Sequence, residues 1–94
     1  MGCNSSGALV ASTVVYADRC HFVSIYATST TNALFTLKVW DSNSSTTSGK
    51  KEVVRLNLKG VAETLEYDMH KVLLAEGMYV EVAAGSGVFS LNYT

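Results

Sequence analysis

The residue types that most often perform chemistry are few in this chain of 94 residues, and they lie far apart. Cys20 and His21 are adjacent, but neighbouring side chains on a strand point to opposite faces, so they do not form a thiolate–imidazole pair. The spacing of Cys3 and Cys20 favours two free thiols over a disulfide, although a bridge stays open. His70 fits a turn or a rim. Local motifs of nucleophilic, nucleotide-binding or zinc-peptidase sites are missing, which predicts a protein that is not an enzyme.

Carboxylates offer one other chemistry, a calcium site built from hard oxygen ligands. Such a site would use four residues: Glu63, Glu66, Asp68 and Glu81. No calcium-loop sequence accompanies them, and a solvated strand face is the favoured interpretation. We therefore expect neither a metal nor a cofactor.

Trp40 is the single tryptophan and directly precedes Asp41. It alternates with Phe35, Leu37 and Val39, so it lies on the opposite face of their strand. An outward tryptophan can anchor an interface or stack on a sugar, whereas burial of both faces would make it a core residue. We predict a possible interface with four members: Trp40, Asp41, Asn43 and Tyr79.

Composition narrows the class of partner. Hydrophobic residues make up 48% of the chain and charged residues only 16%, against roughly 25% charged in a typical domain. The net charge is −1 without a basic patch, which argues against nucleic-acid binding. No stretch approaches the ~20 apolar residues that span a membrane, and no signal peptide is apparent. Weak charge repulsion instead favours a homo-oligomer or docking on a larger assembly.

The N-terminus matches a modification pattern. Residues 1–6 read Met-Gly-Cys-Asn-Ser-Ser, the M-G-x-x-x-[ST] acceptor for myristoylation at Gly2, and Cys3 could take a second acyl chain. A frayed polar terminus is favoured over lipidation. We expect residues 1–7 to form a flexible N-terminal segment and residues 8–94 to form one domain.

Apolar and polar residues alternate along much of the chain, which is the pattern of half-buried strands. Clear alternation covers residues 35–39, 54–58, 65–69, 78–82 and 89–93, and β-branched and aromatic residues favour strands over 8–16 and 20–28. Residues 70–75 fit a helical turn, a strand or a loop. The pattern predicts an all-β antiparallel sandwich of about seven strands, jelly-roll or immunoglobulin-like, with a small barrel as the alternative. Its expected core is Phe35, Leu37, Val39, Val54, Leu56, Val80, Val82, Phe89 and Leu91.

Three segments carry a resemblance to a known class: residues 35–43, ending in Trp-Asp-Ser-Asn; residues 76–82; and residues 87–93. Over residues 8–94 the chain resembles the small β-sandwich virion proteins of tailed bacteriophages. The resemblance implies a capsid decoration or cement subunit that binds the major capsid protein or another virion protein. It also implies an oligomer located in the virion and assembled in the host cytoplasm. A ligand- or carbohydrate-binding module of a phage tail or adhesin is the alternative.

Folding without a metal can be tested directly, because a structural metal site needs about four convergent ligands. We expect that extensive dialysis against a chelator leaves the thermal unfolding curve unchanged. Stoichiometric zinc in elemental analysis, together with unfolding by the chelator, would contradict this expectation.

Overall fold

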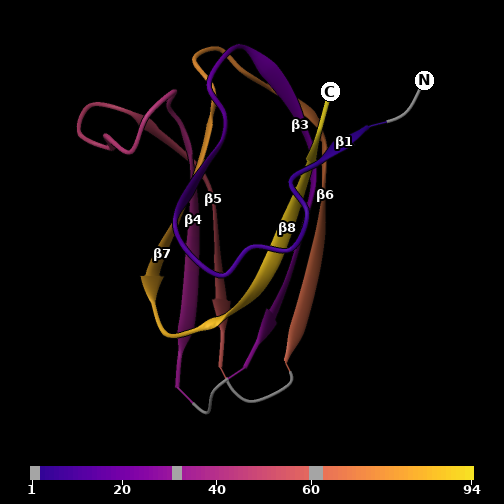
Figure 1. Cartoon of the computed structure of the whole chain (residues 1–94), viewed down its shortest axis with the longest axis vertical. Coiled ribbons are helices and arrows are strands. Elements are labelled where there is room, and N and C mark those ends of the chain that lie inside the picture. The colour runs from indigo at the N-terminus through magenta and orange to yellow at the C-terminus, as the bar shows by residue number, and fades with distance from the viewer. Residues whose placement is uncertain (1–2, 31–32, 60–62) are drawn as a thin grey trace.

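The computed structural model describes residues 3–30, 33–59 and 63–94. Eight strands follow one another along the chain (Figure 1). They are β1 (Asn4–Ser5), β2 (Thr13–Tyr16), β3 (Cys20–Ser29), β4 (Phe35–Asp41), β5 (Lys51–Leu58), β6 (Thr64–Leu74), β7 (Met78–Ala84) and β8 (Gly87–Tyr93). The described residues contain no helix, and so none that is long and apolar enough to cross a membrane.

The strands form two four-stranded antiparallel sheets. The first sheet has the order β1-β8-β3-β6 and the second has the order β2-β7-β4-β5. The strands pair as β1 with β8, β2 with β7, β3 with β6, and β4 with β5. This pairing is the arrangement of a jelly roll. The two sheets stay separate, so the all-β sandwich is confirmed and the barrel alternative is wrong. The strand order also selects the jelly roll over the immunoglobulin-like topology.

The core lies between the two sheets, where the inward faces of the alternating strands meet. Seven residues of the expected core are buried: Phe35, Leu37, Val39, Leu56, Val80, Phe89 and Leu91. Val54 and Val82 are partly buried and pack against that cluster. The alternation missed the contribution of β3, which adds Phe22, Ile25 and Ala27 at 0 to 1% exposure.

An aromatic pair joins the sheets across this core. The ring of Phe35 on β4 lies 6.3 Å from that of Phe89 on β8, with the planes inclined by 40°. Gly87 makes room for the pair, since a Cβ atom there would overlap the Phe35 ring and the carbonyl oxygen of Thr28. Tilted aromatic pairs add about 0.5–1.5 kcal/mol to the burial of their surface.

One segment differs from its expected structure. Asn4 and Ser5, which the sequence leaves in the terminal segment, form β1 and pair with Tyr93 and Asn92. Of the three alternatives for residues 70–75, the strand is found over residues 70–74, which continue β6. The strand stays extended because it keeps its pairing with β3 beyond an internal bulge.

The core assignment predicts the effect of one substitution. Leu37 is 0% exposed, so Leu37→Ala should lower the free energy of unfolding by about 2–5 kcal/mol through lost burial and a cavity. Lys51→Ala, on an exposed position of β5, should change it by less than about 0.5 kcal/mol. Urea unfolding followed by circular dichroism measures both. Equal losses in the two variants would contradict the assignment.

Candidate functional site

The outer face of the second sheet carries a row of apolar side chains near one end. Val14 on β2 is in register with Tyr79 on β7, and Tyr79 is in register with Trp40 on β4. The three therefore lie side by side on the face that points away from the core, as the alternation of β4 predicts for Trp40. We call Val14, Tyr79 and Trp40 the aromatic row.

The members of this row differ in how much surface they offer. Val14 is 37% exposed, Trp40 is half-buried, and Tyr79 is buried at 8% between its two neighbours. The indole N–H of Trp40 donates a 3.0 Å hydrogen bond to the carboxylate of Glu81, which lies on the same face of β7. This hydrogen bond holds the Trp40 ring in one orientation on the outer face of the sheet.

Asp41 has a structural task. Its carboxylate accepts backbone hydrogen bonds from Ala75 at 3.1 Å, Glu76 at 2.9 Å and Gly77 at 3.3 Å. Three donors satisfy this carboxylate and fix the turn between β6 and β7. Asp41 thus follows Trp40 at the end of β4, and its oxygens already have partners within the chain.

The loop over residues 42–50 projects next to the row (Figure 1). Buried Ser42 organises it, because its hydroxyl lies 2.9 Å from the carbonyl of Ser44 and 2.8 Å from that of Thr46. An ion pair between Lys50 and Glu76 ties the far end of the loop to the β6–β7 turn. Asn43 is exposed on this loop.

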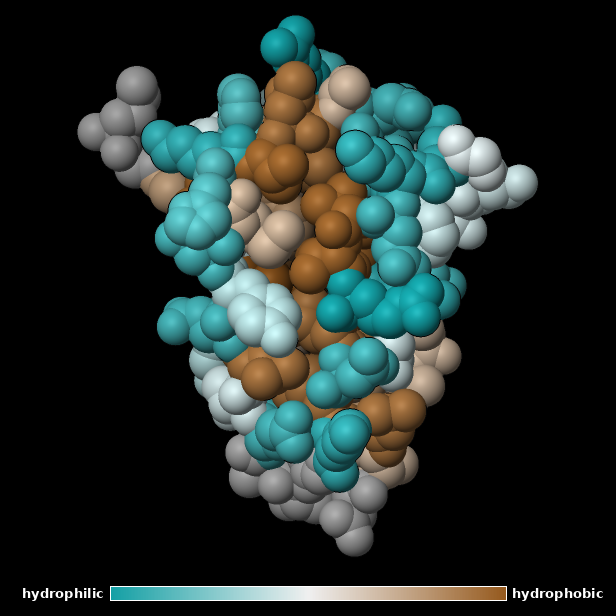
Figure 2. All heavy atoms as spheres, turned by 180° about the vertical axis from the view of Figure 1, so that it is seen from behind, coloured by the Kyte–Doolittle hydropathy of each residue, from teal (hydrophilic) through white to brown (hydrophobic). Residues whose placement is uncertain are grey.

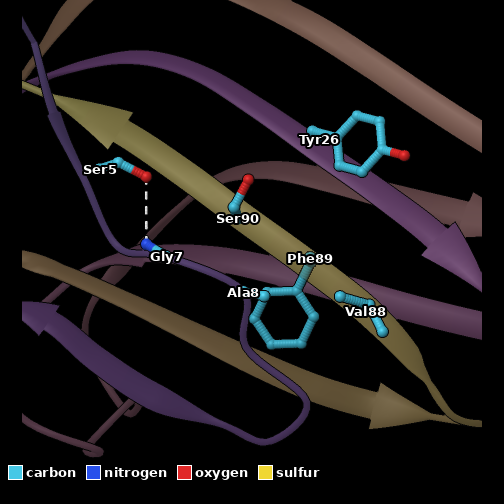
Figure 3. Close-up of a pocket in the computed structure, with 7 residues that line it drawn as sticks. All are labelled: Ser5, Gly7, Ala8, Tyr26, Val88, Phe89 and Ser90. Atoms are coloured by element: carbon cyan, nitrogen blue, oxygen red, sulfur yellow. Dashed lines mark hydrogen bonds between the residues drawn. The ribbon is translucent and has the colours of Figure 1, made fainter.

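A shallow pocket lies elsewhere, between the N-terminal segment and the first sheet (Figure 3). Its volume is about 230 Å³, and its lining comprises Ser5, Gly7, Ala8, Tyr26, Val88, Phe89 and Ser90. This is smaller than the ~300–1,000 Å³ of typical small-molecule sites. Tyr26 is the only titratable side chain among the lining residues, so the pocket offers no acid–base pair.

Groups that could perform chemistry are kept apart. Cys20 is buried, and burial, followed by the charges of Asp41 and Asp18, raises the pKa of its thiol, which keeps it protonated and unreactive. Both cysteines are free thiols. Glu66 and Asp68 lie on β6 while Glu81 lies on β7 of the other sheet. Within the described residues, no three His, Cys, Asp or Glu side chains gather in a way that could hold a metal.

Comparison with known proteins gives no assignment: no protein family matches the chain, and no curated protein or solved structure matches it significantly. The fold class is an eight-stranded jelly roll, and function has to be inferred from its surfaces.

Sequence reasoning missed two members of this surface. On the sequence alone, Glu81 is considered only as a calcium ligand. Glu81 follows Tyr79 by two residues on the same strand, so both side chains point outward, and the Glu81 carboxylate accepts the hydrogen bond of the Trp40 indole. Val14 could not be found, because its place in the row depends on β2 pairing with β7, which no local pattern encodes.

The two candidate residues after Trp40 should respond differently to truncation. Asp41→Ala leaves three backbone donors without their acceptor, so we expect a loss of about 1–3 kcal/mol in the free energy of unfolding. Asn43→Ala, on the exposed part of the loop, should stay within about 0.5 kcal/mol. Chemical unfolding measures both values. A neutral Asp41→Ala would show that the turn does not depend on this carboxylate.

Proposed function

We propose that this chain is a non-enzymatic structural subunit of a virion. In this role it decorates or cements a capsid by binding the major capsid protein. The bound surface would be the aromatic row together with the exposed part of the 42–50 loop, including Asn43. Within the row, Tyr79 would support its two more exposed neighbours, and Asp41 would hold the adjoining β6–β7 turn.

The observation that carries the proposal is the outward position of Trp40, the partly exposed tryptophan that ends the aromatic row on the β5 side. Tryptophan and tyrosine are enriched at the energetic centres of protein interfaces, where polar surroundings exclude water from them. Trp40 is held by Glu81, and the Ser/Thr-rich loop over residues 42–50 follows it closely along the chain. A fixed aromatic anchor inside a polar rim is the usual anatomy of a protein-binding surface.

The fold and the composition agree with this role. Jelly rolls occur in viral capsid and lectin domains, although a fold alone does not determine a function. Charged residues form only 16% of the chain, which weakens repulsion between subunits. The resemblance of residues 35–43, 76–82 and 87–93 to phage virion proteins points the same way.

A carbohydrate-binding module is the second candidate, and the Trp40–Glu81 pair favours it. An aromatic ring offers a stacking surface to a sugar, and a neighbouring carboxylate can accept bonds from hydroxyl groups. The burial of Tyr79 limits the aromatic surface to a single ring. Saturable, Trp40-dependent binding on a glycan array would favour this candidate.

The capsid proposal can be tested by co-sedimentation. The labelled protein is mixed with empty shells assembled from the major capsid protein of the same source genome. We expect saturable binding, and we expect Trp40→Ala to raise the dissociation constant at least about tenfold, as truncation of an interface anchor does. Circular dichroism confirms that the variant is folded.

Tyr26→Ala is the matched control, because Tyr26 is an aromatic residue, 43% exposed, on the outer face of the other sheet. It should bind shells like the unaltered protein. Failure of the unaltered protein to co-sediment would refute the proposal. Equal weakening by both substitutions would remove the aromatic row from the interface.

A further inference from the structure

The sandwich is uncovered along the edges of β5 and β6. Tyr67 on β6 is paired with Ile25 on β3 and shares its inward face, yet Tyr67 is 43% exposed while Ile25 is 1% exposed. Val72 is likewise paired with Phe22, and Val72 is 39% exposed while Phe22 is 0% exposed. These core-facing side chains on β6 therefore reach water, because the second sheet covers this edge strand only in part.

The opposite side of the sandwich is closed. There the connection from β1 to β2 crosses from one sheet to the other (Figure 1), and Leu9 packs against the core. Leu9 is held by two backbone hydrogen bonds with Phe89, of 2.7 and 2.9 Å. The part of the chain that the structure describes has no comparable cover between β5 and β6.

The uncovered side is visible as an apolar stripe. Figure 2 shows hydrophobic side chains gathered into one continuous band along the molecule, with hydrophilic side chains on both sides of it. The inward-facing residues that are incompletely buried along these two edges are Val53, Val54, Leu65, Tyr67, Met69 and Val72. We call this band between the edges of β5 and β6 the open seam.

Both strands that border the seam end their sheets. Among the described residues β5 pairs only with β4, and β6 pairs only with β3, so one edge of each can accept another strand. A bulge limits the usable part of β6. Residues 69–71 face the single residue Val23, and His70 and Lys71 have φ angles of 52° and 58°. Residues 64–68 form the regular stretch before the bulge.

The charges on the outward side chains of β5 and β6 indicate which of these two strands pairs with which in a second copy. The outward positions of this β6 stretch carry Glu66 and Asp68, whereas those at the matching end of β5 carry Arg55 and Asn57, with Lys59 just beyond. Pairing β6 with another β6 would set acid against acid, which destabilises a ladder. Pairing β6 of one copy with β5 of another instead brings the acidic side chains near Lys59 and Arg55, although Arg55 also forms a 2.9 Å ion pair with Glu52 of its own strand.

We propose that two copies of this chain associate through their open seams, with β6 of each copy pairing antiparallel with β5 of the other. A two-fold axis parallel to the strands produces both pairings at once, because β5 and β6 run in opposite directions on the same side of the sandwich (Figure 1). Tyr67 and its inward neighbours of one copy then pack beside the partly buried Val54 at the edge of β5 of the other. Each sheet becomes continuous with a sheet of the second copy.

The size of the seam sets the strength of the contact. The regular stretch of β6, residues 64–68, spans about 17 Å and the sheets lie ~10 Å apart, so the two copies bury a small interface, no larger than the ~1,000 Å² lower limit of specific contacts. A dissociation constant on the order of micromolar is expected. The contact needs no shell, so it is independent of the capsid proposal.

Sedimentation of the purified full chain tests the dimer. Between about 1 and 200 μM, a range that brackets a micromolar dissociation constant, the mass should rise from 10.1 kDa towards twice that value. Tyr67→Lys places a charge in the seam and should raise the dissociation constant at least about tenfold. Tyr26→Lys is the control, because Tyr26 is also 43% exposed but lies outside the seam. A monomer at 200 μM, or equal effects of the two variants, would overturn the proposal.

Charge reversal separates the two possible strand pairings. Glu66→Lys should weaken the dimer at least about threefold if β6 meets the basic β5 of the other copy. The double variant Glu66→Lys with Arg55→Glu should recover the lost affinity. If Glu66→Lys instead tightens the dimer, β6 pairs with β6 and the proposed arrangement is wrong.

Discussion

The molecule depends on one apolar layer that both sheets share. Each sheet has an inward face that cannot remain in water, and the Phe35–Phe89 pair fixes the two faces against each other. Gly87 permits that approach because it carries no side chain at the point of closest contact. The layer must also be covered along its sides, and the structure covers one side with Leu9 while leaving the β5–β6 side to its own edge residues.

The same layer explains why the aromatic row is well positioned. Phe35, Leu37 and Val39 anchor the inward face of β4, so the outward face of that strand has no freedom to turn. Asp41 then joins the end of β4 to the β6–β7 turn, and Ser42 holds the following loop in one conformation. A surface supported in this way loses little conformational entropy when it binds a partner.

The alternation of apolar and polar residues predicted most of the fold but few of the residues of the candidate site. It identified most of the strands and seven buried core positions, because the two-residue period of a strand can be recognised from neighbouring residues alone. Strand order depends on pairing between segments that are far apart in the sequence, so the position of Val14 beside Tyr79 could not be predicted. The bulge at His70 and Lys71 could not be predicted either, because both residues have positive φ angles, which residues other than glycine seldom adopt. Alternation also placed Leu65, Tyr67 and Met69 on one face, but it could not tell that the opposing sheet leaves that face uncovered.

The two proposed contacts are compatible because they use different surfaces. The aromatic row lies on the outer face of the second sheet, whereas the open seam lies between two sheet edges. In a dimer with its two-fold axis along the strands, the outer faces of the two second sheets point in opposite directions. If both proposals hold, one dimer would present two aromatic rows on opposite sides. Linked sites would then raise the apparent affinity without any new contact at the row itself, provided that both rows engage at the same time.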